Sequence, residues 1–259
     1  MNNATKGVFL AVLAAAAISS ANVSVKYFLR FTNPESLAIL WYLPTVVAAL
    51  AITFWKKSVM KEIFNHWKQG LVLGLIYFFA AIFWFNSINI IGAELTGFIT
   101  RLEIVFAVIL AVLFLKEKLN LKETSGIALA VIGTIVISYS DGNYIRLGSL
   151  TALLASFAIA LHLLAAKVIV KKASPVTMLG FRNFFAALFL AAYVLAFKEF
   201  KPVGYELIPA LIALSLLSSF IGFYFLYKSL KYLDAAKVGA LRVLDPVFIL
   251  IYVLVLFQT

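Results

Sequence analysis

The chain has 259 residues, of which 64% are hydrophobic and 13% are charged. Soluble domains average about 45–50% apolar and about 25% charged residues, so this composition excludes an ordinary soluble protein and predicts an integral membrane protein. The net charge is +11, and there is no cysteine. The lack of cysteine excludes disulfides, thiolate metal sites and cysteine nucleophiles.

Apolar stretches of about 20 residues, the length that crosses about 30 Å of hydrocarbon as a helix, follow one another along nearly the whole chain. Nine spans are expected, at about residues 7–28, 35–55, 70–90, 94–115, 123–140, 148–170, 174–197, 207–229 and 235–257. Their connections are short and leave no room for a separate soluble domain. The sequence therefore predicts an all-α integral membrane protein that crosses the bilayer many times.

The positions of the Lys and Arg residues indicate how the chain is oriented in the membrane. Most Lys and Arg residues outside the spans fall on the side shared by the N-terminus and the even-numbered connections. The exceptions are Lys26, Arg30, Arg146, Lys198 and Lys201. Because cytoplasmic loops carry an excess of Lys and Arg, we expect a cytoplasmic N-terminus in the inner cell membrane and no nucleic-acid partner.

The two halves of the sequence resemble each other at a shift of 141 or 142 residues. The clearest matches pair Lys26 with Lys167, Pro34 with Pro175, Gly97 with Gly239 and Glu103 with Asp245. Five helices per copy is an odd number, so the second copy enters the membrane from the opposite side. We expect two inverted repeats, residues 1–147 with five helices and residues 148–259 with four, so that a tenth helix is missing from a five-plus-five architecture.

Two patterns are similar to those of EamA-type proteins in the drug/metabolite transporter superfamily. They are LEIVF at residues 102–106 followed by LKEKL at 115–119, and LDPVF at 244–248 in the second copy. The likeness runs from about residue 6 to 257. It implies ten helices in two inverted five-helix repeats and carrier-mediated movement of small metabolites, often amino acids or their derivatives and frequently outward. One departure is Ile104, where the family commonly has proline.

Charged residues inside the spans are the first candidates for a site, because each costs at least about 2.5–3.5 kcal/mol near the bilayer centre. Arg242 and Asp245, three residues apart, share a helix face and are expected to pair. Arg101 and Glu103, two residues apart, point about 200° around the helix from each other, so we expect them to find partners on other helices, including a Glu103 to Arg242 contact. A packed structural network and a substrate or proton site are both open.

Further candidates are polar or aromatic residues at matching or neighbouring positions of the spans. They are Thr96, Thr100, Asn22, Trp84, His162, Arg182 and Tyr224. Thr96, Thr100 and Glu103 form one polar stripe at helical spacing, which predicts either a cavity wall or close helix packing. Pro246 adds a polar position, because it leaves the carbonyl of residue 242 without its usual helical N–H.

The function predicted from these features is a secondary transporter that moves a small organic molecule by alternating access, in the direction of export. A non-transporting membrane partner or scaffold is the alternative, and a membrane-embedded lipid-modifying enzyme is less favoured. No clustered aspartates for Mg²⁺ and no nucleophile with a nearby base are evident in the sequence. We therefore expect no catalytic residue, metal or cofactor; the expected partners are a substrate and the lipid bilayer, with a homodimer left open.

Overall fold

The computed structural model describes residues 2–55, 57–115 and 143–257, and the regular secondary structure in these ranges is entirely helical. The all-α prediction is confirmed for these residues. The fifth expected span, at about 123–140, lies outside the described residues.

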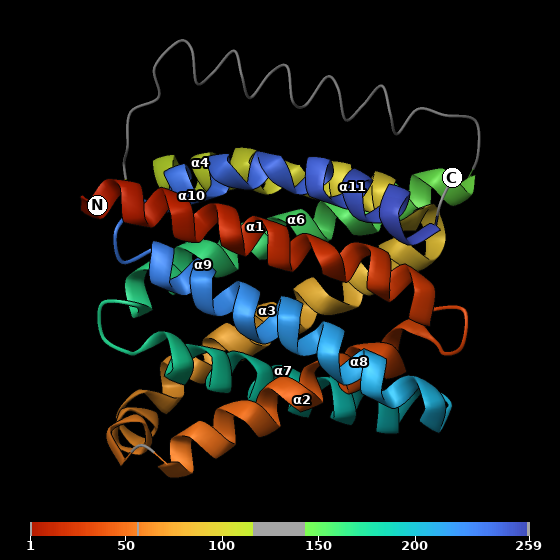
Figure 1. Cartoon of the computed structure of the whole chain (residues 1–259), viewed down its shortest axis with the longest axis horizontal. Coiled ribbons are helices and arrows are strands. Elements are labelled where there is room, and N and C mark those ends of the chain that lie inside the picture. Colours follow the sequence, from red (N-terminus) through yellow and green to blue (C-terminus); the bar gives the residue numbers. More distant parts are fainter. Residues whose placement is uncertain (1, 56, 116–142, 258–259) are drawn as a thin grey trace.

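The first half contains a 3₁₀ turn between its last two described helices. Its elements are α1 (Asn3–Phe28), α2 (Pro34–Trp55), α3 (Lys57–Ile99), η1 (Thr100–Leu102) and α4 (Glu103–Leu115). Helix α3 has 43 residues, which at 1.5 Å per residue would extend about 65 Å, twice the thickness of the hydrocarbon. It is broken at Gly92, where φ is +86°. That left-handed conformation is readily adopted by glycine, and it separates the expected spans 70–90 and 94–115; in Figure 1 the chain crosses the molecule along α3 and returns along α4.

The second half has the same order of long and broken helices. Its elements are α6 (Asn143–Ile169), α7 (Pro175–Phe197), η2 (Tyr205–Leu207), α8 (Ile208–Ser215), η3 (Leu216–Gly222), α9 (Phe223–Ser229), α10 (Ala235–Leu241), η4 (Arg242–Leu244) and α11 (Asp245–Phe257). The segment η3 is a π-helix inside the span formed by α8 and α9. Figure 1 shows α1 and α6 running across the molecule in opposite directions.

Six stretches of the described residues are long and apolar enough to cross a membrane. They are Asn3–Phe28, Pro34–Ile52, Asn65–Leu110, Arg146–Ile169, Pro175–Phe197 and Tyr205–Ser229, and Asp245–Val255 is a shorter apolar helix. The stretch Asn65–Leu110 covers two of the expected spans, which are separated within it by the break at Gly92.

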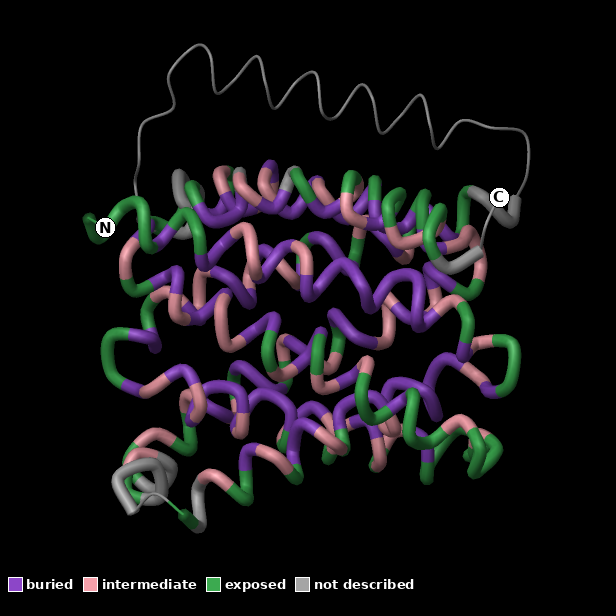
Figure 2. Tube along the Cα trace, in the orientation of Figure 1, coloured by how far each residue is buried: buried purple, intermediate pink, exposed green. Residues whose placement is uncertain are grey.

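Helix α1 is the most buried of these stretches and packs against α3, η3, α9 and α11. Alanines such as Ala11, Ala14 and Ala15 keep its surface flat and are fully buried, as is common where membrane helices approach closely. At Gly222 of η3 an added Cβ would lie only 2.7 Å from Cγ1 of Ile18. Figure 2 shows buried residues along the inward faces of the bundle and exposed ones at the connections.

Contacts at the connections define two ends of the bundle. At one end, Asn33 Nδ2 donates to the Glu199 carbonyl at 2.9 Å, and Thr32 donates to the carbonyl of Lys201. At the opposite end, Ser174 N donates to Glu62 Oε2 at 2.8 Å, and Lys167 Nζ donates to the Leu233 carbonyl at 2.6 Å. Among the described residues, the lysine-rich and lysine-poor connections that these contacts involve thus lie at separate ends.

Candidate functional site

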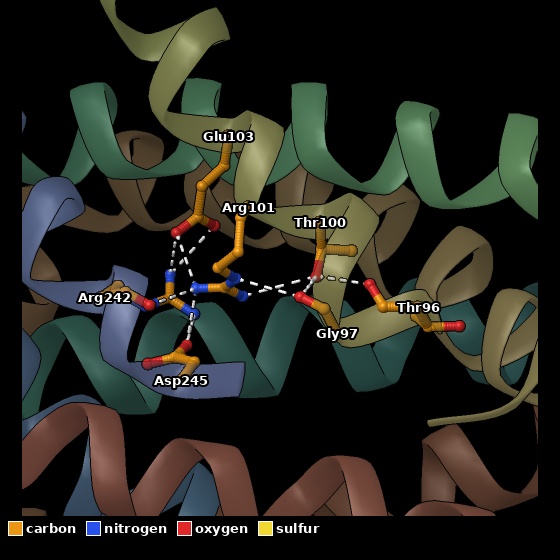
Figure 3. Close-up of polar contacts among 7 residues, drawn as sticks. All are labelled: Thr96, Gly97, Thr100, Arg101, Glu103, Arg242 and Asp245. Carbon is orange, nitrogen blue, oxygen red and sulfur yellow. Dashed lines mark hydrogen bonds and ion pairs between the residues drawn. The ribbon is translucent and has the colours of Figure 1, made fainter. Parts of the chain in front are cut away.

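Four charged side chains from η1, α4, η4 and α11 form one closed network (Figure 3). Arg101 Nη1 lies 2.6 Å from Asp245 Oδ2 and 3.4 Å from Glu103 Oε1. Arg242 completes the ring, with Nη1 at 2.8 Å from Glu103 Oε1 and Nη2 at 3.1 Å from Asp245 Oδ2. The expected Arg242–Asp245 and Glu103–Arg242 contacts are both present. Two cations and two carboxylates give the network no net charge.

The expectation that Arg101 and Glu103 do not contact each other was wrong. Thr100–Leu102 is a 3₁₀ turn, in which successive residues are about 120° apart rather than about 100°. Residues two apart then lie closer around the axis, and the long arginine side chain reaches back to Glu103. As a result each carboxylate contacts both guanidinium groups.

The backbone carbonyl of Arg242 is a further acceptor in this network. Pro246 offers it no helical N–H, and it accepts hydrogen bonds from the Asp245 N–H within the 3₁₀ turn and from Arg101 Nη1 at 3.2 Å. Two polar atoms still lack a partner among the described residues, namely Nε of Arg242 and Oδ1 of Asp245. A buried polar atom without a partner is costly, so these atoms mark places where a water or a ligand atom could bind.

A cavity with an empty volume of about 710 Å³, which includes its open mouth, lies beside this network. Helices of both halves supply its wall. The lining residues with polar or aromatic side chains are Asn22, Trp41, Tyr42, Tyr77, Trp84, Arg101, His162, Ser218, Ser219, Phe223 and Arg242. Arg101 and Arg242 thus connect the ion network to the cavity.

Arg182 of α7 is fully buried behind one wall of this cavity. Its Cζ atom lies 3.7 Å from the ring centre of Phe223 and 4.2 Å from that of Tyr77. Its hydrogen bonds go to the Ser219 carbonyl at 3.1 Å and to Asn183 Oδ1 at 2.9 Å. These contacts place a cation directly behind two aromatic rings of the cavity wall.

A family model for the EamA-like transporter family matches the chain twice, over residues 5–139 and 146–259. The chain belongs to this family. It is 23% identical over 228 residues to an uncharacterized transporter of Archaeoglobus fulgidus, a match that covers 86% of this chain and 80% of that protein. A solved structure described as "Crystal structure of protein" has a TM-score of 0.75 at 17% identity, covers 98% of this chain and 88% of that one, and supports the fold alone.

Membership in the EamA-like family, together with several apolar helices, makes this chain a multi-pass membrane protein of a transporter family. Of its residues predicted from the sequence, Asn22, Trp84 and His162 line the cavity together with Arg101 and Arg242. Glu103 and Asp245 lie one residue deeper, behind the two arginines.

Three predicted residues of this EamA-like protein lie outside the cavity lining. Thr96 exchanges a hydrogen bond of 2.8 Å with Ser87. Thr100 lies beside the ion network, where its Oγ1 donates to the Thr96 carbonyl at 2.8 Å and accepts from Arg101 Nη2 at 3.4 Å (Figure 3). Tyr224 is outside the cavity lining, and its ring lies 5.3 Å from the Lys228 ammonium.

Sequence reasoning missed several lining residues of the cavity. Trp41 and Tyr42 come from α2, Tyr77 from α3, and Ser218 and Ser219 from the π-helix η3. Aromatic clusters in the third and eighth spans were a signal for Tyr77. No comparable signal marks Tyr42. The two serines lie on a π-helix, which turns residues onto faces that the regular 3.6-residue period does not predict. Within the described residues no group of three or more His, Asp or Glu side chains forms a metal site.

Proposed function

We propose that this protein is a secondary carrier that moves a small organic molecule by alternating access, with the cavity as its substrate site. The observation that carries the proposal is the shared wall: α1, α2 and α3 line one part of the cavity, and α6, η3 and α9 line the other. A site at the seam between two halves can open to either side when the halves rock against each other.

Helix boundaries support two repeats, residues 1–147 and 148–259. Glu103–Leu115 and Asp245–Phe257 are offset by 142 residues at both ends, as are the 3₁₀ turns that precede them. The Gly92 break falls opposite the connection between α9 and α10. The two separate matches to the family model agree with this division. Five crossings in the first repeat would invert the second, giving the five-plus-five architecture.

The N-terminal caps of α2 and α7, and the contacts that they make at the two ends of the bundle, also occupy equivalent positions in the two repeats. Asn33 caps α2 through a 2.8 Å bond from Ser36 N, and the equivalent Ser174 caps α7 through a 3.3 Å bond from Thr177 N. The first cap contacts the α7–η2 connection at one end, and the second contacts Glu62 at the opposite end. Such contacts, related by inversion, are suited to close one side while the other opens. We assign the lysine-rich end, with the N-terminus, to the cytoplasm.

Flux in proteoliposomes tests the transport proposal. The purified full chain would be reconstituted, and uptake of radiolabelled L-phenylalanine, 3-phenylpropionate and tyramine would be compared with empty liposomes. We expect saturable uptake of at least one probe. No uptake of any of the three by folded protein would favour the non-transporting partner instead.

A pair of variants separates transport through the cavity from leakage. Ala81 lies in the cavity wall and is 2% exposed, whereas Val47 lies on the outer surface and is 59% exposed. Ala81→Trp fills the cavity and is expected to abolish uptake, and Val47→Trp is expected to leave it unchanged. Size-exclusion profiles establish that both variants are folded.

A further inference from the structure

Arg182 is the one fully buried arginine in the described spans, and it forms no ion pair with a described carboxylate. Arg101 and Arg242 are compensated by Glu103 and Asp245 in the ion network. Every described contact of Arg182 is with a neutral group: the Ser219 carbonyl, the Asn183 amide, and the aromatic rings and hydroxyl of neighbouring residues. Its exposed fraction is 0%, so solvent does not neutralise it either.

The neutral partners only partly offset the cost of this charge. Cation–π contacts and hydrogen bonds are favourable, but a buried charge without a counter-ion remains expensive in a membrane span. Arg182 is thus a buried positive charge without a carboxylate partner among the described residues. An anion bound nearby would offset it.

The cavity lies on the other side of the Tyr77 and Phe223 rings from Arg182 and could hold such an anion. Tyr77, Phe223 and Ser219 each contact Arg182 and also line the cavity. A second path runs through Tyr227, whose hydroxyl lies 3.5 Å from Arg182 Nη1 and 2.8 Å from His162 Nε2. At the low effective dielectric of a protein interior, a charge one ring away still acts strongly on the cavity.

A separate donor within the cavity wall points to the same ligand chemistry. Arg242 lines the cavity and is 4% exposed, and its Nε–H has no acceptor among the described residues. The aromatic wall formed by Trp41, Tyr42 and Trp84 is suited to an apolar or aromatic body. The lining therefore offers a hydrogen-bond donor, an apolar surface and a net positive field.

We propose that the cavity selects an organic monoanion, in which one carboxylate is attached to an apolar or aromatic body, and that Arg182 supplies the charge preference through the Tyr77–Phe223 wall. This rests on the proposed function, because it names the substrate class of the same cavity. Arg182 acts through the wall and is a positioning residue for the anion. A zwitterion, whose net charge is zero, is a poorer ligand than the matching anion.

Binding of a matched series to the purified full chain tests this proposal. The probes are 3-phenylpropionate, 3-phenylpropionamide, 3-phenylpropylamine and L-phenylalanine, which share the aromatic body and differ in charge. Binding would be followed by quenching of the fluorescence of the cavity tryptophans Trp41 and Trp84 and by the shift in unfolding temperature. We expect the carboxylate to bind at least tenfold more tightly than the amide and the zwitterion, and the amine to bind most weakly.

Variants at position 182 separate the charge from the structural role of the side chain. Arg182→Gln is expected to bring the carboxylate-to-amide ratio close to one while amide binding persists, and Arg182→Lys is expected to retain the preference. Lys171→Gln, on the exposed α6–α7 connection, is the control and leaves the ratio unchanged. The preference of the wild-type chain is also expected to persist at 0.5 M salt, because buried charges are screened little.

The binding results test the monoanion inference independently of whether the protein transports the ligand. Equal binding of carboxylate and amide by the wild-type chain overturns the monoanion inference, as does an unchanged ratio in folded Arg182→Gln or no binding of any probe. The wild-type series settles the matter even where Arg182→Gln does not fold. If the amide or the zwitterion binds best and is transported, the carrier proposal stands and only the monoanion inference fails.

Discussion

Arg101 Nη1 donates a hydrogen bond to the carbonyl oxygen of Arg242, across the two halves of the chain, at 3.2 Å. Pro246 has no N–H to offer this carbonyl, so it accepts from the Asp245 N–H of the 3₁₀ turn and has room for a second bond from Arg101. A backbone carbonyl of the second half therefore accepts a hydrogen bond from an arginine of the first half. The same two arginines, Arg101 and Arg242, line the cavity. The ion network holds the seam together as well as forming part of its wall.

Breaking the ion network on one side is expected to destabilise the protein strongly. Asp245 Oδ2 contacts Arg101 and Arg242 at 2.6 and 3.1 Å, so Asp245→Asn leaves two buried cations with a single carboxylate. Loss of one partner from a buried pair typically costs about 3–5 kcal/mol. Denaturation in detergent micelles measures the effect.

The double variant Arg101→Gln, Asp245→Asn is the control, because it removes one charge of each sign. It is expected to be less destabilised than the sum of its single variants. Glu103 also contacts both arginines, so Glu103→Gln is expected to lose stability too. Helical spacing in the sequence predicted a partner on the same helix for Asp245 only. Additive losses would show that the four groups do not act as one network.

Glu62 is expected to make stability depend on acid pH. Burial raises the pKa of Glu62, but hydrogen bonds from the Thr177 hydroxyl and the Ser174 amide outweigh it and hold the pKa below its ordinary value of 4.5. A depressed folded-state pKa means that the stabilising contribution is complete above pH 4.5 and is lost as pH falls through the folded value. Glu62→Gln should cost about 0.5–2 kcal/mol at pH 7, as for other helix caps.

Thermal unfolding between pH 3 and pH 7 measures this difference. The wild-type chain and Glu62→Gln should converge at the acid end. The exposed Glu206→Gln serves as the control. A constant gap between wild type and Glu62→Gln across the whole range would contradict the assignment.

Alanine substitutions at two glycines distinguish the effect of close helix packing on stability from the effect of helix propensity. An added Cβ at Gly222 would lie 2.7 Å from Ile18 Cγ1 and 3.1 Å from its backbone nitrogen, whereas at Gly180 the nearest atom is at an ordinary 3.4 Å. Gly222→Ala is therefore expected to destabilise by about 1–3 kcal/mol, as overpacked sites do. Gly180→Ala should be neutral or slightly stabilising, because alanine favours a helix. Similar effects at both sites would mean that α1 and η3 are not in close contact.

The contacts at the two ends are expected to control which side of the cavity opens. Asn33→Ala removes the bond to the Glu199 carbonyl at one end, and Thr177→Val removes the bond to Glu62 at the other. Each loss should shift the population toward the state open on its own side. Labelling rates of a cysteine at position 81, measured from each side, should change in opposite directions. A change in the same direction in both variants would be inconsistent with two gates.

The sequence was sufficient for the all-helical class and for the pairing of charged residues three apart, because apolar length and helical spacing are local properties. It also indicated that the Arg242 carbonyl lacks its usual helical donor at residue 246, since Pro246 has no N–H whatever its surroundings. The Arg101–Glu103 contact depended on a 3₁₀ turn, and Tyr42 reached the cavity through tertiary packing. Neither has a local sequence signal. Arg182 was a candidate by depth, but its lack of a carboxylate partner could be seen only in three dimensions.

Two-sided accessibility of position 81 tests the alternating-access account most directly. The chain has no native cysteine, so Ala81→Cys provides a single thiol in the cavity wall, and Val47→Cys provides a lipid-facing control. Oriented proteoliposomes would be treated with a membrane-impermeant maleimide from either side. The account predicts labelling of Ala81→Cys from both sides without continuous leakage of a polar dye, and protection by bound substrate. Labelling from one side only, or from both sides through an open leak, would contradict it.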